Sequence, residues 1–387
     1  MPILNRAGEL QEEVSGWRRQ LHQAPELLFD VHQTAAFVAE KLKGFGCDVV
    51  ETGIGRTGVV GIIKGAKGDG PVIGMRADMD ALPIEEITGL PWASKVPGKM
   101  HACGHDGHTA MLLGAAKYLC ETRNFSGSVA VIFQPAEEGG GGGLAMVEDG
   151  MMDKFGIREV YGMHNAPGVP LGNFAIRKGS LMAASDTFEI VIAGKGSHAA
   201  QPHLSVDPVL TSAYVIIALQ SIVSRETDPL KSLVISVTTT HGGDAYNVIP
   251  MEVKLTGTVR TLLPEIRDFA EKRLAEVAKA TAEAHGAVAH VSYHRGYPVT
   301  FNHAEETDFA VSIAAKVSGP NRVEEDMAPK MGAEDFSYML EARPGAFIFL
   351  GVGDTANLHH PAYDFNDEAI PYGISYWVSL AETKLAA

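Results

Sequence analysis

Apolar side chains recur at two different spacings along this chain, and the two spacings predict its helices and strands. Leu10, Val14, Trp17 and Leu21 follow one another at intervals that predict an amphipathic helix over residues 8–23. Short β-branched runs alternate with further helical stretches, an order typical of an α/β sheet covered by helices. The other predicted helices of this half span 31–44 and 106–120, and its predicted strands span 47–51, 72–75, 128–133 and 159–163.

From about residue 185 the order of the elements changes. A β-α-β-β-α-β succession appears, which is typical of a ferredoxin-like α+β unit, and afterwards the first pattern resumes. A chain of 387 residues is expected to form two domains. We therefore predict a discontinuous α/β domain of residues 1–184 and 296–387, with a mixed sheet flanked by helices, interrupted by a domain of residues 185–295. The inserted strands are expected at 187–193, 233–240, 252–260 and 288–294 and the inserted helices at 203–224 and 263–285; helix 304–317, strand 346–350 and a helix from 367 follow.

Charge and cysteine content narrow the classes of partner. The formal net charge of -15 would repel nucleic acid and anionic membrane surfaces, so neither is expected as a partner. The first residues lack the apolar core of a signal peptide, and we expect no stretch of the roughly 18 to 20 apolar residues that span a bilayer. Three cysteines form no disulfide framework, and Cys47 and Cys120 are expected to be buried free thiols. These features favour a cytoplasmic protein.

The segment from Met100 to Thr109 is the densest in metal-ligating side chains. It reads Met-His-Ala-Cys-Gly-His-Asp-Gly-His-Thr, with three histidines, a cysteine and an aspartate. Three predicted strands end beside further candidate ligands, and strand carboxyl ends are where α/β sheets place their chemistry. We therefore predict a metal site at this edge of the sheet. The candidates outside the segment are Asp78, Asp80, Glu137, Glu138, His164 and His360.

A divalent metal that activates water needs thiolate, imidazole or carboxylate ligands, an open position and a nearby base. Cys103 and His105 are close enough in sequence to serve together in a loop, and His164, Glu138 and His360 could complete two sites. Two such metals about 3.5 to 4 Å apart can polarise a carbonyl and bind the attacking hydroxide at once.

Two acidic residues could assist the metals without binding them. Adjacent side chains of an extended segment point differently, so Glu137 could act as general base while Glu138 ligates. Asp80 could orient a ligand imidazole, as metal-bound histidines usually require.

These residues also have purely structural interpretations. Glu137 and Glu138 could cap the turn or helix that follows them, because carboxylates favour helix N-termini. His164 could be a hydrogen-bonded core histidine, and His101 and His108 are expected to be structural rather than ligating. The joint occurrence of candidates at successive strand ends favours the metal site.

Other catalytic schemes lack their sequence signatures. Gly53, Gly55 and Gly58 match a Gly-x-Gly-x-x-Gly pattern, but the run that follows is β-branched and predicts a strand. A dinucleotide site requires a helix there, so we interpret the pattern as a β-turn. The sequence contains no Gly-x-Ser-x-Gly elbow, no Gly-x-x-x-x-Gly-Lys-[Ser/Thr] phosphate loop and no His-Glu-x-x-His helix.

Taken in order, five motifs resemble those of the M20 metallopeptidase family. More narrowly, they resemble the amidohydrolase branch that contains hippurate hydrolases, N-acetyl-amino-acid deacetylases and plant auxin-conjugate hydrolases. The resemblance covers essentially the whole chain, including the inserted unit. The motifs are Asp78-Met79-Asp80, the segment from Met100 to Thr109, Pro135-Ala136-Glu137-Glu138-Gly139, Gly162-Met163-His164 and Leu358-His359-His360-Pro361.

This resemblance implies a complete set of roles at the metal site. It implies two divalent ions per subunit, with Cys103 as the bridging ligand, Glu137 as the general base and Asp80 orienting a ligand from behind. In the wider family a histidine stands at Asp78 and an aspartate at Cys103, so zinc, manganese, nickel and cobalt all remain candidate metals. The implied metal ligands are Cys103, His105, Glu138, His164 and His360.

The inserted unit resembles the family's lid and dimerisation domain. Its Gly-Lys-Gly-Ser-His-Ala-Ala stretch implies that His198 stabilises the tetrahedral oxyanion, often from a partner subunit. Asn247 and Arg260 are implied contacts for the substrate carboxylate, although Arg260 could equally form a salt bridge within the unit.

The resemblance implies hydrolysis of the amide in N-acyl-L-amino acids, such as benzoyl-glycine or N-acetyl substrates, by a homodimer or a higher oligomer. A dipeptidase of the same family and a non-catalytic, metal-dependent small-molecule binder are the alternatives.

Overall fold

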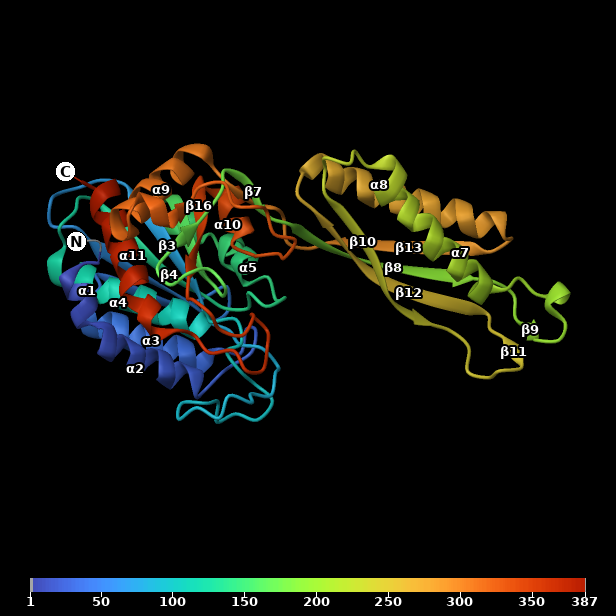
Figure 1. The fold of residues 1–387 in the computed structure, drawn as a ribbon, viewed down its shortest axis with the longest axis horizontal. Coiled ribbons are helices and arrows are strands. Elements are labelled where there is room, and N and C mark those ends of the chain that lie inside the picture. The colour runs from blue at the N-terminus through green and yellow to red at the C-terminus, as the bar shows by residue number, and fades with distance from the viewer. Residues whose placement is uncertain (1–2, 387) are drawn as a thin grey trace. The chain divides into compact units, whose positions relative to one another are not determined.

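The computed structural model describes residues 3–386 and divides the chain into two compact units. The first unit is made of Met1–Leu181, Phe301–Ala328 and Asp335–Ala387, and the second of Met182–Thr300 and Pro329–Glu334 (Figure 1). The first unit is therefore assembled from three segments of the chain. The predicted insert, residues 185–295, lies inside the long segment of the second unit. Two short strands, β7 (Gly179–Met182) and β14 (Thr300–Asn302), lie where the chain passes from one unit to the other.

A mixed eight-stranded sheet forms the centre of the first unit, in the order β1-β2-β4-β3-β5-β16-β6-β15. The inner strands β4, β3, β5 and β16 run parallel, whereas β1 and β2 form an antiparallel hairpin that continues antiparallel onto β4. The α/β class with a mixed sheet is therefore confirmed. The strands are β1 Val49–Ile54, β2 Gly58–Lys64, β3 Val72–Asp78, β4 Ser128–Gln134, β5 Ile157–Ala166, β6 Phe174–Ala175, β15 Val323–Glu324 and β16 Gly345–Gly351.

Helix α4 is deeply buried in this unit. Its apolar side chains from Ala110 to Ala116 are removed from solvent on all sides of the helix, as the nearly continuous apolar sequence predicted. Burial of this kind holds the first turn of α4 rigidly against the sheet. The helices of the unit are α1 Asn5–Glu9, α2 Gln11–His22, α3 His32–Phe45, α4 His105–Thr122, α5 Gly142–Glu148, α6 Met151–Lys154, α9 Ala304–Ser318, α10 Ser337–Ala342 and α11 Ile370–Lys384, with 3₁₀ turns at Pro320–Arg322 and Asp367–Ala369.

Two strand boundaries differ from the predictions in a way that affects the site. Strand β5 continues to Ala166, so His164 lies inside the strand and not at its end. Strand β3 likewise includes Asp78. Pairing with β16 extends β5, since Phe349 lies opposite His164 in the ladder. The predicted turn is present at residues 55–57, after β1; Gly55 in this turn and Gly53 in the strand before it have positive φ angles of 56° and 88°.

The second unit has the ferredoxin-like order of elements that the sequence predicted. Its four long strands form an antiparallel sheet in the order β10-β12-β8-β13, and β9 pairs with β11 in a separate two-stranded ribbon. Two helices, α7 and α8, share its apolar core. The elements are β8 Ala184–Ala193, β9 Ser197–His198, α7 Pro208–Ser221, β10 Leu233–His241, β11 Val248–Ile249, β12 Glu252–Thr261, α8 Pro264–Ala284 and β13 Val288–Arg295, with single turns at Pro202–Leu204 and Ile222–Glu226.

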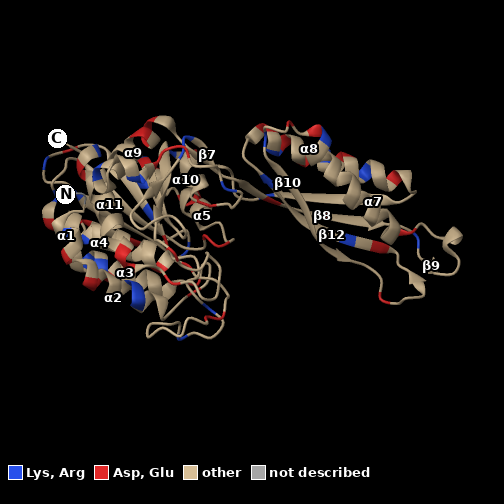
Figure 2. Cartoon of the chain, in the orientation of Figure 1, with Lys and Arg blue, Asp and Glu red and all other residues tan. Residues whose placement is uncertain are grey.

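Helix α7 is apolar on both its buried and its exposed faces. Asp207 caps its start by accepting hydrogen bonds from the amides of Val209 and Leu210, at 2.9 and 3.2 Å. Figure 2 shows Lys, Arg, Asp and Glu along α8 but none on α7. By length and composition, the segment Pro208–Glu226 is apolar enough to cross a membrane, so the prediction that the chain has no such stretch is wrong. Part of its apolar content is explained by Val215 and Leu219, which are buried in the core of the unit.

Candidate metal centre

The turn before α4 places the first two candidate ligands. Gly104 has φ 88°, and a Cβ atom there would lie 2.7 Å from the Tyr363 hydroxyl and 2.8 Å from the Asn165 side-chain oxygen. Only glycine fits this position, because both the backbone angle and the space exclude a side chain. The turn leaves Cys103 just ahead of the helix and makes His105 its first residue.

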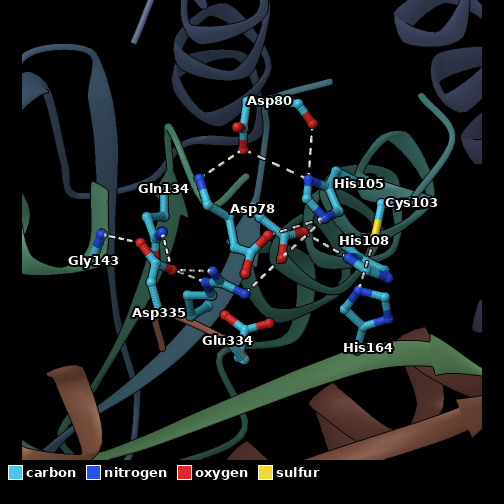
Figure 3. Close-up of polar contacts among 12 residues, drawn as sticks. Asp78, Asp80, Cys103, His105, His108, Gln134, Gly143, His164, Glu334 and Asp335 are labelled. Carbon is cyan, nitrogen blue, oxygen red and sulfur yellow. Dashed lines mark hydrogen bonds and ion pairs between the residues drawn. The ribbon is translucent and has the colours of Figure 1, made fainter. Parts of the chain in front are cut away.

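The parallel strands β3, β4 and β5 bring the remaining candidates to the same place. The Sγ of Cys103 lies 3.4 Å from Nε2 of His164 on β5 (Figure 3). The Nε2 of His105 lies 4.0 Å from Oε2 of Glu137 and 3.9 Å from Oε1 of Glu138 in the loop after β4. The predicted convergence at one edge of the sheet is therefore present for these five residues.

His359 joins this cluster, and its neighbour His360 does not. The Nε2 of His359 lies 3.3 Å from Oε1 of Glu138, and its backbone has a φ of 64°, which is uncommon for a non-glycine residue. His360, which the resemblance implied as a ligand, is exposed, and its Nδ1 accepts a hydrogen bond from the Ala362 amide at 3.0 Å. The Leu-His-His-Pro motif holds both histidines, so sequence alone offered no means of choosing between them.

The donor set fits a divalent metal. The Nε2 of His105 and the Oε1 of Glu138 are buried, and neither has a hydrogen-bond partner among the described residues. Orphaned buried polar atoms are costly unless something else binds them. Potential ligand atoms gather in groups of three, and within each group they lie within 4.8 Å of one another. Groups that share members are Cys103 with His105 and His164, Cys103 with Glu138 and His359, and His105 with Glu137 and Glu138.

The pKa values at the cluster also indicate a place for positive charge. Burial, reinforced by Glu138 and Glu137, raises the pKa of the Cys103 thiol well above its usual range. Burial by itself lowers the pKa of His105, but Asp78, Asp80 and Glu138 raise it to about 10. Thiolate and neutral imidazole are the forms that bind metals, so a divalent cation would here replace protons.

Asp80 holds the loop that carries the two glutamates. Its Oδ1 accepts a hydrogen bond from the Glu137 amide at 2.9 Å and its Oδ2 one from the Glu138 amide at 3.1 Å. The Nδ1 of His105 is hydrogen-bonded to the main-chain oxygen of Asp80 at 2.8 Å, whereas the nearest side-chain oxygen is 3.6 Å away. Asp80 therefore contacts the imidazole through its backbone, and an orienting role for its carboxylate stays a prediction. Ala136, just before the glutamates, has φ 54°, so this loop is in an uncommon conformation.

A buried polar network that the sequence analysis missed lies beneath the cluster. Asp78 accepts from Arg76 Nη1 at 2.6 Å and is bonded to His108 Nδ1 at 2.6 Å. The His108 Nε2 lies 2.7 Å from the side-chain oxygen of Asn165. The side-chain nitrogen of Asn165 donates a hydrogen bond to the Tyr363 hydroxyl at 2.5 Å. One signal was available, since Arg76 interrupts an apolar strand and a buried arginine requires partners. Its other partners are Gln134 at 2.9 Å and Asp335 at 3.1 Å (Figure 3).

Comparison with known proteins finds relatives that include a metal-binding peptidase, in agreement with a metal site at this cluster. The model of peptidase family M20/M25/M40 matches residues 74–383. The chain is 43% identical to hippurate hydrolase of Campylobacter jejuni, over 96% of this chain and 97% of that protein. It is 43% identical to N-acetyl-L-cysteine deacetylase of Bacillus subtilis, over 93% and 85%. A crystal structure of a dinuclear metal-binding M20 peptidase from Bacillus subtilis superposes with a TM-score of 0.86 at 36% identity, covering 98% and 99%.

The chain belongs to the M20 family. The resemblance to its amidohydrolase branch and the α/β fold with an inserted unit are therefore confirmed. Family membership and the donor set also support the use of divalent metal.

Three further residues that the resemblance implied for this M20 protein belong to the second unit. His198 on β9 lies opposite Val248 on β11, and the Asn247 carbonyl accepts a hydrogen bond from the Ala199 amide at 2.9 Å. His198 and Asn247 are thus neighbours, and both are exposed. Their contact arises from a two-stranded ribbon between distant segments.

Arg260, on β12, is half-buried, and burial lowers its pKa. Its Nη1 donates to the Thr258 hydroxyl and to the Val259 carbonyl, the latter at 3.2 Å. No carboxylate among residues 3–386 forms an ion pair with it, so the alternative of a salt bridge within the second unit is not observed.

Proposed function

We propose that the protein is a metal-dependent amidohydrolase that cleaves the amide bond of N-acyl-L-amino acids, releasing a carboxylic acid and a free amino acid. The observation that carries this proposal is the buried convergence of thiol, imidazole and carboxylate groups around the orphaned Nε2 of His105, with Glu137 beside it. The relatives named hippurate hydrolase and N-acetyl-L-cysteine deacetylase support this substrate class, because both names describe hydrolysis of an acylated amino acid.

The proposed cofactor is a pair of divalent ions per subunit, drawn from zinc, manganese, nickel and cobalt. When bound, they would polarise the amide carbonyl and lower the pKa of the attacking water. The mixture of sulfur, nitrogen and oxygen donors suits these metals better than magnesium or calcium. His359 replaces His360 in the proposed ligand set, which is Cys103, His105, Glu138, His164 and His359.

Glu137 is proposed to take a proton from the attacking water and return it to the leaving amine. Its carboxylate lies within 4.0 Å of His105 Nε2, and its residue is only 7% exposed, so the proton transfer would occur away from bulk solvent. The hydrogen bond from its amide to Asp80 supports a positioning role for Asp80.

In the second unit, His198 is proposed to donate a hydrogen bond to the oxyanion that forms on the amide carbonyl. Asn247 and Arg260 are proposed to bind the substrate carboxylate. The absence of an ion pair to Arg260 among the described residues supports this role, because a planar guanidinium can accept a carboxylate in two parallel hydrogen bonds.

A second copy of the chain is the proposed partner, and helix α7 is the proposed contact. Val209, Leu210, Tyr214 and Ile217 are 47, 54, 46 and 68% exposed. Leu210, Tyr214 and Ile217 follow helical spacing and so form an apolar stripe on a helix that carries no charge. A homodimer or higher oligomer through the second unit would cover this stripe.

We also propose that the protein is soluble and cytoplasmic.

The test is a panel of N-acyl amino acids, varied independently at the acyl group and the side chain, and assayed with each metal. Removal of metal by a chelator should abolish turnover, and re-addition should restore it. Full activity of the metal-free protein would contradict the proposal. Faster cleavage of dipeptides with a free amino group would identify a dipeptidase, and binding without turnover would identify a non-catalytic binder.

The adjacent glutamates offer a matched pair of variants. Glu137→Gln should keep its metal and lose roughly 10² to 10⁴-fold in kcat, which is the usual contribution of a general base. Glu138→Gln should lose metal as well as turnover. Metal content measured on both proteins separates the two roles, and a near-normal rate in Glu137→Gln would remove that residue from the mechanism.

A further inference from the structure

Cys47 and Cys120 lie in contact although they are far apart in the sequence. Their Sγ atoms are 3.6 Å apart, and both side chains are half-buried. Cys47 lies in the turn between α3 and β1, where its amide donates to the Leu42 carbonyl at 3.1 Å, and Cys120 lies near the end of α4. Free cysteines were predicted here; that their sulfurs touch was not foreseen.

A single arginine holds the two cysteine-bearing segments together. Arg123 ends α4 with a φ of 49°. Its Nη1 donates to the Asp48 carboxylate at 2.7 Å and to the Lys64 carbonyl at 2.8 Å, and its Nη2 donates to the Gly46 carbonyl at 2.7 Å. Because Gly46 and Asp48 flank Cys47, this clamp fixes the position of one thiol relative to the other.

The surroundings shift the pKa values of the two thiols in opposite directions, so the thiols differ in reactivity. The hydrogen bond between the two thiols lowers the pKa of Cys120 against the effect of burial, and the positive charge of Arg123 lowers the pKa of both thiols. The same hydrogen bond, together with burial, raises the pKa of Cys47. Cys120 therefore ionises first, and a thiolate is the form of cysteine that attacks oxidants.

We propose that Cys47 and Cys120 form a dithiol that a hydroperoxide converts reversibly into a disulfide, and that this site is separate from the metal-binding thiol of Cys103. The Cys120 thiolate attacks the peroxide oxygen, giving a sulfenic acid and hydroxide. The Cys47 sulfur then attacks the sulfenic sulfur, giving the disulfide and water. In total two thiols and one hydrogen peroxide yield one disulfide and two waters.

The geometry favours this bond over competing products. The sulfurs need to approach from 3.6 Å to about 2.05 Å, a movement of about 1.5 Å. Cys103 is 7% exposed and lies at the metal centre, so it is less accessible to the oxidant. The bond would close a long loop of the chain and is expected to raise thermal stability by restricting the unfolded state.

The experiment uses the metal-loaded protein, which is treated with increasing hydrogen peroxide, quenched with an alkylating reagent and digested without reduction. We expect mass spectrometry to find a peptide that joins Cys47 to Cys120. The protein should lose two of its three free thiols and recover both after addition of dithiothreitol. The thermal midpoint should rise by several degrees in the oxidised protein. Absence of the joined peptide, with oxidation confined to Cys103 or proceeding to sulfinic acid, would overturn the proposal.

Two variants give matched controls. In Cys47→Ser the sulfenic acid on Cys120 lacks its partner and should accumulate, so dimedone should label Cys120. In Cys120→Ser, Cys47 should remain a thiol under the same treatment. Turnover of the reduced forms of both variants should equal that of the unmodified chain. Equal dimedone labelling of both cysteines would contradict the assigned order of attack.

Discussion

The Nε2 of His359, an exposed residue, lies 3.3 Å from the Oε1 of Glu138, at the edge of a cluster in which Cys103, His105 and His164 are buried. This contact raises the pKa of His359 and, against the effect of burial, helps to hold the pKa of Glu138 below its usual value. The contact therefore favours the protonated imidazole and the ionised carboxylate, and the imidazole must lose its proton to become a ligand.

Replacement of His359 should weaken metal binding, whereas replacement of His360 should not. We expect His359→Ala to lower affinity for the weaker-held ion by more than the roughly 10- to 100-fold that an outer-shell change costs. His360→Ala is the matched control, because His360 is the adjacent histidine, is likewise exposed, and bonds the Ala362 amide instead of Glu138. Metal titration followed by calorimetry measures both. The opposite result, with loss only in His360→Ala, would restore His360 to the ligand set.

Asp80→Asn should lower turnover while the protein stays folded. Asparagine keeps one acceptor oxygen but presents an amide N–H toward one of the two backbone amides that Asp80 now binds. Glu137 and Glu138 should then lose their fixed position. We expect kcat to fall by roughly 10- to 100-fold with a smaller change in KM. His105 keeps its bond to the main-chain oxygen, but displacement of Glu138 should also weaken metal binding, so kcat is to be measured at saturating metal. A change confined to KM would argue against this role.

The buried pair of His22 and Asp106 should make stability depend on pH. The two atoms Nδ1 and Oδ2 are 2.8 Å apart. Burial lowers the pKa of His22, but Asp106 and Glu86 raise it to about 9, against about 6.5 in an unfolded chain. Protonated His22 therefore stabilises the fold fully below about pH 6.5, and this contribution is lost as pH rises to about 9.

Among the described residues, the four groups nearest to His22 are expected to keep their charge states across this window. The pKa values of Asp106 and Glu86 are held below their usual ranges, burial lowers that of His101 to about 4, and Arg18 remains charged. We expect the free energy of unfolding of the metal-free protein to fall by on the order of 3 kcal/mol between pH 6.5 and 9, relative to His22→Gln. Denaturant unfolding of both proteins measures this difference. Parallel pH profiles would contradict it.

Ile217→Lys should dissociate the proposed oligomer. The side chain is 68% exposed on the apolar stripe of α7, and burying a lysine there is costly. Ile87→Lys is the matched control, since Ile87 is 65% exposed in the first unit. Sedimentation should find Ile217→Lys monomeric and Ile87→Lys unchanged. If His198 acts from the partner subunit, the monomer should also lose turnover. An active monomer would assign His198 to its own subunit, and an unchanged oligomer would remove α7 from the interface.

Much of the fold could be predicted because its signals are local. Apolar spacing along α2 and α4 and β-branched runs along β3 and β4 reveal elements without knowledge of their neighbours. The order of those elements also predicted the inserted unit. Strand ends were less certain, and β5 runs past His164 because pairing with β16, far along the chain, extends it.

At the site, the sequence by itself determined which chemical groups are present and that they follow parallel strands, whose ends share one edge of the sheet. Tertiary structure alone decided how those groups are used. Leu-His-His-Pro contains two identical side chains, and only the backbone turn at His359 brings one of them to Glu138. The contact of Cys47 with Cys120 has the same origin. Local patterns constrain a few neighbouring dihedral angles, whereas such contacts depend on how distant segments pack.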